Sequence, residues 1–400
     1  MKRIAFVTHN YTGATLPIVK ELLSLGYRVD YFFLFGKEPK NGEHPKEAML
    51  LRNFHARMGL HEIDCYYFKE LYDYMGSENF HMFYFRTSRP FENVPILRNV
   101  MQVWRNFQFN SLVKYFKSQN YDMINMVCNF DHNDFLLLHK KLPNVNIITS
   151  FHEVCNHWNP DFNHPSPLLK HLFSAKKEIV VHSKNSYRDI LQYHDVDKEC
   201  VHHINFGIFE TFKTMEGCVN FELPSKYILF FGGIRPYKGL PYLLEALKID
   251  PTCLGNYKLV IAGGGHDDAL DEFRRMENVM VLNRYIKNEE VVYLIKHCSF
   301  VVCPYTTMSQ SGLPQTVFAF DKPIIASDLD GFKEVVTHQK TGLLFKTKDA
   351  TSLAEVMKRL STDDDLYCTM VENIKIFGDL KKEYGWPYIT QQYLEIIAKK

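Results

Sequence analysis

Apolar runs typical of strands alternate with helical patterns along the whole chain. In the first half, RIAFV and YRVDYFFLF are separated by a stretch with apolar residues at helical spacing. The second half repeats the pattern, because YILFFGG is followed by the amphipathic LPYLLEALKI and then by KLVIAGGG. Repeated strand–helix–strand units form mostly parallel sheets covered by helices on both faces. The pattern therefore predicts an α/β protein with two Rossmann-like, doubly wound domains.

The boundary between the domains is predicted where this periodicity stops. The stretch from Glu210 to Lys226 has no clear apolar period and contains Gly217 and Pro224. The chain ends with apolar residues at helical spacing from Trp386 onward, which predicts an amphipathic closing helix. The predicted N-terminal domain, linker, C-terminal domain and closing helix span 1–209, 210–226, 227–380 and 381–400.

Charge and composition exclude several functions. Among 400 residues, 47 Lys and Arg nearly balance 46 Asp and Glu, so no overall positive field favours nucleic acid. The nine cysteines include no C-x-x-C pair, and no uncharged apolar run reaches the roughly 18 residues that a membrane-spanning helix needs. The basic N-terminus leads into a first strand rather than a signal peptide. A cytoplasmic enzyme is expected, and any anion site must be local.

Two loops have the composition of anion sites. SQSGLP, from Ser309 to Pro314, precedes a short helix, and the first backbone N–H groups of a helix attract anions. Ser311 is placed to cap that helix. FGGIRPYKG sets Arg235 and Lys238 between a buried strand and a helix, where two cations suit a diphosphate. The alternative is that both cations are ordinary solvated residues at a helix start.

Other strand-end loops are more ambiguous. His152 follows the strand NIITS and has either a site role or the role of an ordinary loop histidine. Its spacing to His157 does not match a zinc motif. The first loop, Asn10, Tyr11, Thr12 and Gly13, either lets a substrate approach the backbone or forms a plain turn.

The segment from Pro95 to Asn120 is basic and aromatic. It contains Arg98, Arg105, Lys114 and Lys117 and no acidic residue. Such a helix can rest on an anionic bilayer surface, but a helix that covers a sheet and has a solvated basic edge fits as well. Peripheral contact with the inner face of the membrane is therefore an alternative to a purely cytoplasmic location.

The order of the motifs resembles one enzyme family. A Lys-Gly loop, a GGG turn, Gly-Leu-Pro before KPIIAS, then DGFKEVV, TGLLF and a Trp-led final helix are similar to family 4 (group 1) glycosyltransferases of the GT-B fold. The resemblance covers about 227–344 and extends more thinly to the first half. It implies two domains facing a cleft, with the final helix packing back toward the N-terminal domain. It also implies a retaining enzyme that moves a sugar from a nucleotide-diphosphate donor.

The resemblance implies roles for individual residues. Lys238 would bind the donor phosphates with Arg235, and the amides of Gly312, Leu313 and Pro314 would cradle the diphosphate. His152 would reach the donor sugar. The loop of Arg284, Tyr285 and Ile286 would contact the base, and the first loop, 10–13, would face the acceptor or the sugar.

Three positions depart from the family pattern. Family members often carry glutamates where this chain has Ser309 and Val317, and an arginine where it has Gly233. Valine cannot accept a hydrogen bond from a ribose. Ser309, Gln310 and Ser311 would then supply polar contacts, as in a subgroup associated with bacterial surface-polysaccharide enzymes.

The predicted function is sugar transfer from a nucleotide sugar to a glycan or lipid-linked glycan acceptor, with no cofactor and no essential metal. Two alternatives remain at this stage. The missing glutamates also fit a non-catalytic nucleotide-sugar binding or partner subunit. Another GT-B enzyme, such as a sugar-nucleotide epimerase or a phosphorylase, has a related architecture.

Overall fold

The computed structural model describes residues 1–9, 12–35, 57–64, 69–87, 98–128, 133–152, 154, 165–308 and 311–399. The chain divides into two compact units. Unit 1 comprises Met1–Asn205 and Trp386–Lys400, and unit 2 comprises Phe206–Gly385. The segment 210–226 therefore lies in unit 2.

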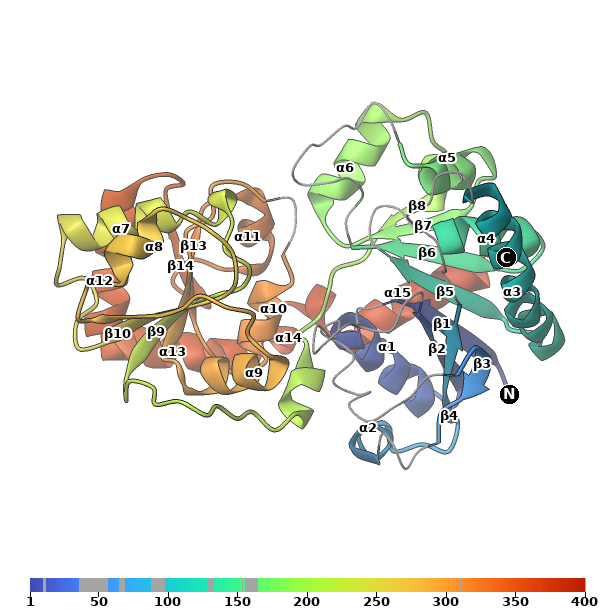
Figure 1. The fold of residues 1–400 in the computed structure, drawn as a ribbon, viewed down its shortest axis with the longest axis horizontal. Helices are drawn as coiled ribbons and strands as arrows, with labels where there is room; N and C mark the ends of the chain where they lie inside the picture. Colours follow the sequence, from blue (N-terminus) through green and yellow to red (C-terminus); the bar gives the residue numbers. More distant parts are fainter. Residues whose placement is uncertain are drawn as a thin grey trace. The chain divides into compact units, whose positions relative to one another are not determined.

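Unit 1 is built on an eight-stranded sheet with the order β3-β4-β2-β1-β5-β6-β7-β8 (Figure 1). All neighbouring strands pair in parallel except β3, which pairs antiparallel with β4. Its strands are β1 (Arg3–Thr8), β2 (Arg28–Phe35), β3 (Gly59–Glu62), β4 (Phe80–Arg86), β5 (Met123–Cys128), β6 (Ile147–Phe151), β7 (Glu178–Val181) and β8 (Val201–His203). Its helices are α1 (Thr12–Ser24), α2 (Lys69–Met75), α3 (Arg98–Gln119), α4 (Asn133–Lys141), α5 (Pro167–Ser174), α6 (Lys184–Tyr193) and α15 (Trp386–Ala398).

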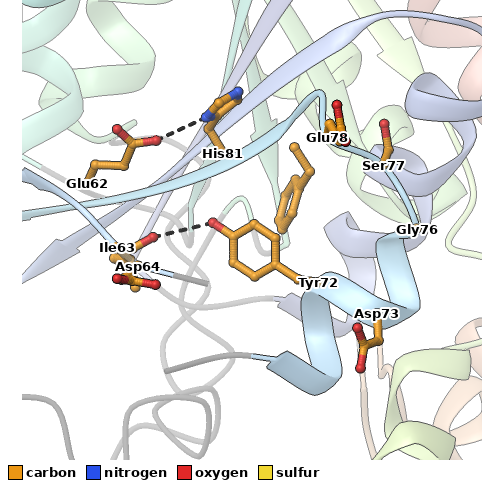
Figure 2. Close-up of a pocket in the computed structure, with 10 residues that line it drawn as sticks. Glu62, Ile63, Asp64, Tyr72, Asp73, Gly76, Ser77, Glu78 and His81 are labelled. Atoms are coloured by element: carbon orange, nitrogen blue, oxygen red, sulfur yellow. Dashed lines mark hydrogen bonds and ion pairs between the residues drawn. The ribbon is translucent and has the colours of Figure 1, made fainter. Parts of the chain in front are cut away.

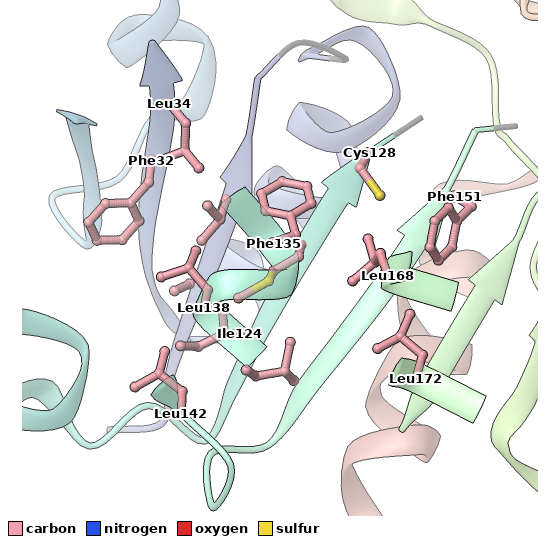
Figure 3. Close-up of a cluster of buried hydrophobic side chains, with 14 of the residues drawn as sticks. Phe32, Leu34, Ile124, Cys128, Phe135, Leu138, Leu142, Phe151, Leu168 and Leu172 are labelled. Atoms are coloured by element: carbon pink, nitrogen blue, oxygen red, sulfur yellow. The ribbon is translucent and has the colours of Figure 1, made fainter. Parts of the chain in front are cut away.

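Apolar side chains from the strands and the covering helices form the core of unit 1. Figure 3 shows Phe135 and Leu138 of α4 lying over strand residues such as Ile124, with Leu168 and Leu172 of α5 beside them. These side chains are fully buried, and each contributes about 1.5–3 kcal/mol relative to exposure. Because both faces of a parallel sheet are covered, its strands are continuous apolar runs, as the sequence pattern predicted.

The final helix α15 belongs to unit 1 although unit 2 precedes it in the chain. It packs against α1, and the Tyr393 hydroxyl lies 3.1 Å from Ser150 Oγ of β6. Trp386, Ile389 and Ile396 are buried, as expected from their helical spacing. The prediction that the final helix packs back onto the N-terminal domain is confirmed.

Unit 2 contains a six-stranded parallel sheet with the order β11-β10-β9-β12-β13-β14 (Figure 1). Its strands are β9 (Tyr227–Phe231), β10 (Lys258–Ala262), β11 (Val279–Leu282), β12 (Phe300–Cys303), β13 (Ile324–Ser327) and β14 (Gly342–Phe345). Its helices are α7 (Leu240–Ile249), α8 (Ala269–Phe273), α9 (Asn288–His297), α10 (Leu313–Phe318), α11 (Asp330–Val335), α12 (Ala350–Thr362), α13 (Asp364–Lys375) and α14 (Phe377–Leu380). One apolar cluster covers each face, so the doubly wound α/β prediction is confirmed.

The strand order of unit 2 reverses between β9 and β12. The chain runs outward from β9 through β10 to β11 and then returns to place β12 on the other side of β9. Ligands of open α/β sheets bind beyond the carboxyl ends of the strands at such a switch point. A ligand site is therefore expected at the loops that follow β9 and β12.

Candidate functional site

Lys238 and Tyr305 meet at this switch point. Lys238 follows β9 and donates a hydrogen bond to the Tyr305 hydroxyl, which follows β12. The Lys238 ammonium also lies 3.9 Å from the centre of the Tyr305 ring, close enough for a cation–π contact. Burial raises the pKa of Tyr305 well above its usual value, so the hydroxyl stays neutral. The half-buried Lys238 ammonium is thus held in place by a hydrogen bond and a ring contact from a neutral tyrosine.

Glycines bring backbone segments close together around this lysine. A Cβ on Gly263, in the GGG turn, would lie 1.9 Å from the carbonyl oxygen of Gly232. A Cβ on Gly239 would lie 1.7 Å from the carbonyl oxygen of Pro304, and Gly239 has a φ of +74°. Only glycine fits these approaches without a shift of the backbone. The GGG turn therefore has a packing role beside Lys238.

The other predicted residues of this loop are more exposed. Arg235 is exposed and its Nη1 donates to the carbonyl oxygen of Ile234, 3.2 Å away. Gly233 is also exposed, and a Cβ there would meet nothing closer than the Gly264 carbonyl oxygen at 3.9 Å. The loop thus presents one ordered cation, Lys238, and one guanidinium on the surface.

Arg284, Tyr285 and Ile286 follow β11, and their backbone lies against the GGG turn. A Cβ on Gly264 would be 3.3 Å from the carbonyl carbon of Arg284. The Arg284 side chain forms two hydrogen bonds with the Glu290 carboxylate, at 2.7 and 2.8 Å. This pairing lowers the pKa of Glu290 and commits the guanidinium to a neighbour. Glu290, which the sequence analysis did not identify, therefore orients the Arg284 side chain, and the Tyr285 side chain beside it is exposed.

The predicted anion loop lies before α10. Ser309 and Gln310 are outside the described residues, but the Ser311 hydroxyl accepts the Leu313 N–H at 3.2 Å. Gly312 packs against the Phe209 ring, where a Cβ would be 2.7 Å away. Leu313 and Pro314 form the first turn of α10, with Pro314 buried. Ser311 thus satisfies one of the N–H groups at this helix start.

Val317 and Gln315 lie further along α10, and both are buried. Val317 is fully buried in the apolar core of unit 2, so it contributes no accessible surface. Gln315 is also buried, and nothing in the described part of the chain hydrogen-bonds its Oε1. Gln315 is a polar residue that the sequence analysis missed, because its neighbours suggested only an apolar helix.

His152 lies at the carboxyl end of β6 in unit 1. Its backbone N–H donates to the Cys128 carbonyl oxygen at 2.9 Å, and its ring lies 5.6 Å from that of His182, centre to centre. Burial lowers the pKa of His152 well below its usual value and that of His182 to about 3. Both imidazoles are therefore neutral at pH 7 and can act as hydrogen-bonding groups rather than as cations.

Two of the four residues predicted to form the first loop are among the described residues. Asn10 and Tyr11 lie outside the described residues. Helix α1 begins at Thr12, so Thr12 and Gly13 are in its first turn and not in a loop as expected. The first N–H groups of a helix need no partner within the helix, so these two residues can enter it without losing a hydrogen bond.

A cavity of about 860 Å³ lies elsewhere in unit 1, beside β3, β4 and α2 (Figure 2). Four of its lining residues carry carboxylates: Glu62, Asp64, Asp73 and Glu78. Among the lining residues that the structure describes, His81 can provide a positive charge, with its Nδ1 3.0 Å from Glu62 Oε1. A negatively charged lining repels a diphosphate, and none of the predicted site residues lies there.

The described residues contain no group of three or more His, Cys, Asp or Glu arranged to hold a metal ion. None of their helices combines the length and the apolar character needed to cross a bilayer.

The architecture of the chain defines its fold. Two Rossmann-like units in one chain form the GT-B fold, and solved structures of this fold align with the whole chain. Sucrose-phosphate synthase from Thermosynechococcus elongatus aligns with a TM-score of 0.62 at 16% identity, covering 100% of both chains. HepE from Anabaena, determined with UDP and glucose, aligns with a TM-score of 0.62 at 13% identity, again over 100% of both chains. The predicted fold class is confirmed.

Sequence comparisons then point to the family. Residues 218–377 match the family model described as "Glycosyl transferases group 1". An uncharacterized glycosyltransferase of Methanocaldococcus jannaschii is 29% identical over 208 residues, which are 50% of each chain. Phosphatidyl-myo-inositol mannosyltransferase of Mycobacterium leprae is 23% identical over 176 residues, 43% of this chain and 46% of the relative. The chain thus spans about half the length of the curated relatives it matches.

Proposed function

We propose that this protein transfers a sugar from a nucleotide-diphosphate donor to a glycan or lipid-linked glycan acceptor, with retention at the anomeric carbon. The observation that carries the proposal is the placement of Lys238. Its ammonium lies at the switch point of a unit matched by the group 1 model, held by neutral Tyr305 and surrounded by close backbone. A lysine at this position suits the charge of a diphosphate.

The proposed reaction needs no covalent enzyme nucleophile. The bond between the anomeric carbon and the diphosphate oxygen breaks, while the acceptor hydroxyl attacks the same face of the sugar. The hydroxyl proton passes to the departing phosphate oxygen. Lys238, with Arg235 able to swing in from the surface, stabilises the negative charge that develops on the leaving group. His152 is neutral and would hydrogen-bond sugar hydroxyls.

The names of relatives support the acceptor class. One relative from Campylobacter jejuni is named as an N-acetylgalactosaminyltransferase acting on a diphospho-undecaprenol-linked sugar, and is 29% identical over 110 residues. A lipid-linked glycan acceptor and a role in surface-polysaccharide synthesis are therefore part of the proposal.

The decisive experiment is a thermal-shift panel with UDP, GDP, ADP and their sugars. A ligand that binds the native state raises its melting temperature by mass action. We expect one nucleotide to stabilise the wild type and to lose its effect in Lys238→Ala. Lys258→Ala is the matched control, because Lys258 is an exposed lysine at the opposite end of the same sheet, at the start of β10.

Two outcomes would contradict the proposal. If no nucleotide acts at millimolar concentration, a non-catalytic role becomes the better explanation. If Lys238→Ala responds like the wild type, the site lies elsewhere. For the metal prediction, sugar transfer should survive EDTA, and loss of activity that magnesium restores would overturn it.

A further inference from the structure

Helix α3 exposes a stripe of apolar side chains on the side that faces away from its own core contacts. Phe109, Leu112 and Phe116 are buried against the sheet. The residues at i, i+3, i+4 and i+7 on the opposite side are exposed by 64%, 69%, 46% and 66%: Val100, Val103, Trp104 and Phe107. Solvated helix faces are normally polar, so an apolar row of this spacing indicates contact with an apolar phase or partner.

Cations continue the same face toward the end of the helix. Lys114 is seven residues beyond Phe107, two helical turns along the same line, and Lys117 lies one turn further. Both are exposed. Lys141 of the neighbouring helix α4 adds a third cation, with its Nζ 2.8 Å from Asn110 Oδ1. The long stems of lysine let such charges reach headgroups while the apolar residues lie deeper.

Among the described residues, α3 itself carries no acidic group and two acidic residues near it are already engaged. Residues 98–119 contain no Asp or Glu. The Asp134 carboxylate on α4 is buried and bound by Arg105, on the inward side of α3. Asp122, just after the helix, accepts the Arg3 N–H at 2.7 Å. The face is therefore apolar and positive, with no exposed negative charge on the helix.

We propose that the outward face of α3, defined by Val100, Val103, Trp104, Phe107, Lys114 and Lys117, docks on the surface of a phospholipid bilayer that contains anionic headgroups. An apolar row beside lysines has the two properties that interfacial helices use: burial at the headgroup boundary and attraction to anionic lipid. A protein partner with an interface of standard size would need roughly 800 Å² on this side. The inference does not depend on the proposed function, because it needs no nucleotide.

The test is co-sedimentation with vesicles of phosphatidylcholine, alone or mixed with phosphatidylglycerol, without nucleotide. We expect binding to the mixed vesicles that falls at least about tenfold in the double variant Val103→Ser, Phe107→Ser, and in Lys114→Glu, Lys117→Glu. High salt should weaken it, since the Debye length shrinks to about 3 Å at 1 M. Leu25→Ser is the matched control, because Leu25 is an exposed apolar residue elsewhere in unit 1.

Tryptophan fluorescence gives a second readout. Trp104 is half-exposed whereas Trp386 is buried, so vesicles should shift Trp104 emission to the blue. Trp104→Phe should keep vesicle binding and lose the shift. Both α3 variants should melt like the wild type, because the changed side chains are exposed.

Three results would overturn the proposal. The first is no sedimentation with mixed vesicles. The second is sedimentation that both α3 variants retain. The third is a wild type that is dimeric by light scattering, does not bind vesicles and becomes monomeric in the serine variant, which would make the face an interface between two copies. None of these results bears on the nucleotide panel.

Discussion

The carboxyl ends of the two sheets carry different chemistry. In unit 2, Lys238 lies near closely packed glycines and donates a hydrogen bond to neutral Tyr305. In unit 1, His152 and His182 lie together as neutral rings. A cation beside accessible backbone suits a polyanion, whereas neutral imidazoles suit hydroxyl groups. The comparison suggests that unit 2 supplies charge and unit 1 supplies hydrogen bonds.

The largest expected difference between the two units is the effect of low pH on their stability. Burial lowers the pKa of His139 and of His182, both in unit 1, to about 3. None of the unit 2 histidines, His266, His297 and His338, is buried. In the unfolded chain these side chains titrate near 6.5, so the unfolded state binds more protons as the pH falls below that value. Unit 1 should lose about 2 kcal/mol of stability for each buried histidine between pH 7 and pH 5.

Urea unfolding can resolve this loss, because Trp104, Trp158 and Trp386 all fall within the ranges of unit 1. Tryptophan fluorescence then follows unit 1, and circular dichroism follows both units. His139→Gln should reduce the pH-dependent loss by about 2 kcal/mol. Equal acid sensitivity of both transitions would break the comparison.

The next largest effect on stability is expected where the backbones at Gly263 and Gly232 approach each other closely. Gly263→Ala places a Cβ 1.9 Å from a fixed carbonyl oxygen, so the GGG turn must move away from Gly232. We expect a loss of about 3 kcal/mol in urea unfolding, together with loss of the nucleotide response. Gly233→Ala is the control, since its Cβ would have ordinary contacts and should change stability little. If Gly263→Ala left the free energy of unfolding unchanged, the turn would be loosely packed.

Tyr305→Phe tests whether the hydrogen bond between Lys238 and the Tyr305 hydroxyl contributes to nucleotide binding. The variant keeps the ring beneath Lys238 and removes only the oxygen that accepts its hydrogen bond. We expect nucleotide affinity to fall five- to tenfold, about 1 kcal/mol, measured by calorimetry. Tyr227→Phe is the matched control, because its buried hydroxyl donates to the Leu294 carbonyl oxygen away from the site. Equal effects of the two variants would assign Tyr305 to packing alone.

The smallest effect is expected at Arg284. Its pair with Glu290 is partly exposed, so Arg284→Gln should cost about 0.5 kcal/mol. The nucleotide response should persist, because only the backbone of this loop is proposed to contact the base. A lost response in the thermal-shift panel would show that the guanidinium itself binds the ligand.

Much of unit 2 could be predicted from its sequence, because strands such as β9 and β10 are short apolar runs that end at glycines. Strand β3 could not, since GLHE has no apolar run and pairs antiparallel at an edge. The contact between Lys238 and Tyr305 depends on β12 lying beside β9. The alternation of strands and helices along the sequence does not predict the order of the strands in the sheet. The burial of Val317 likewise depends on which side of α10 faces the core.

The position of α15 has a consequence for synthesis on the ribosome. Unit 2 is continuous, so it can fold as soon as residues 206–385 have left the exit tunnel. Unit 1 begins earlier but must wait for Trp386–Ala398 before Tyr393 can reach Ser150 and α15 can cover α1. The unit made first is therefore the unit completed last, and until then its apolar surface beneath α15 is open to chaperones.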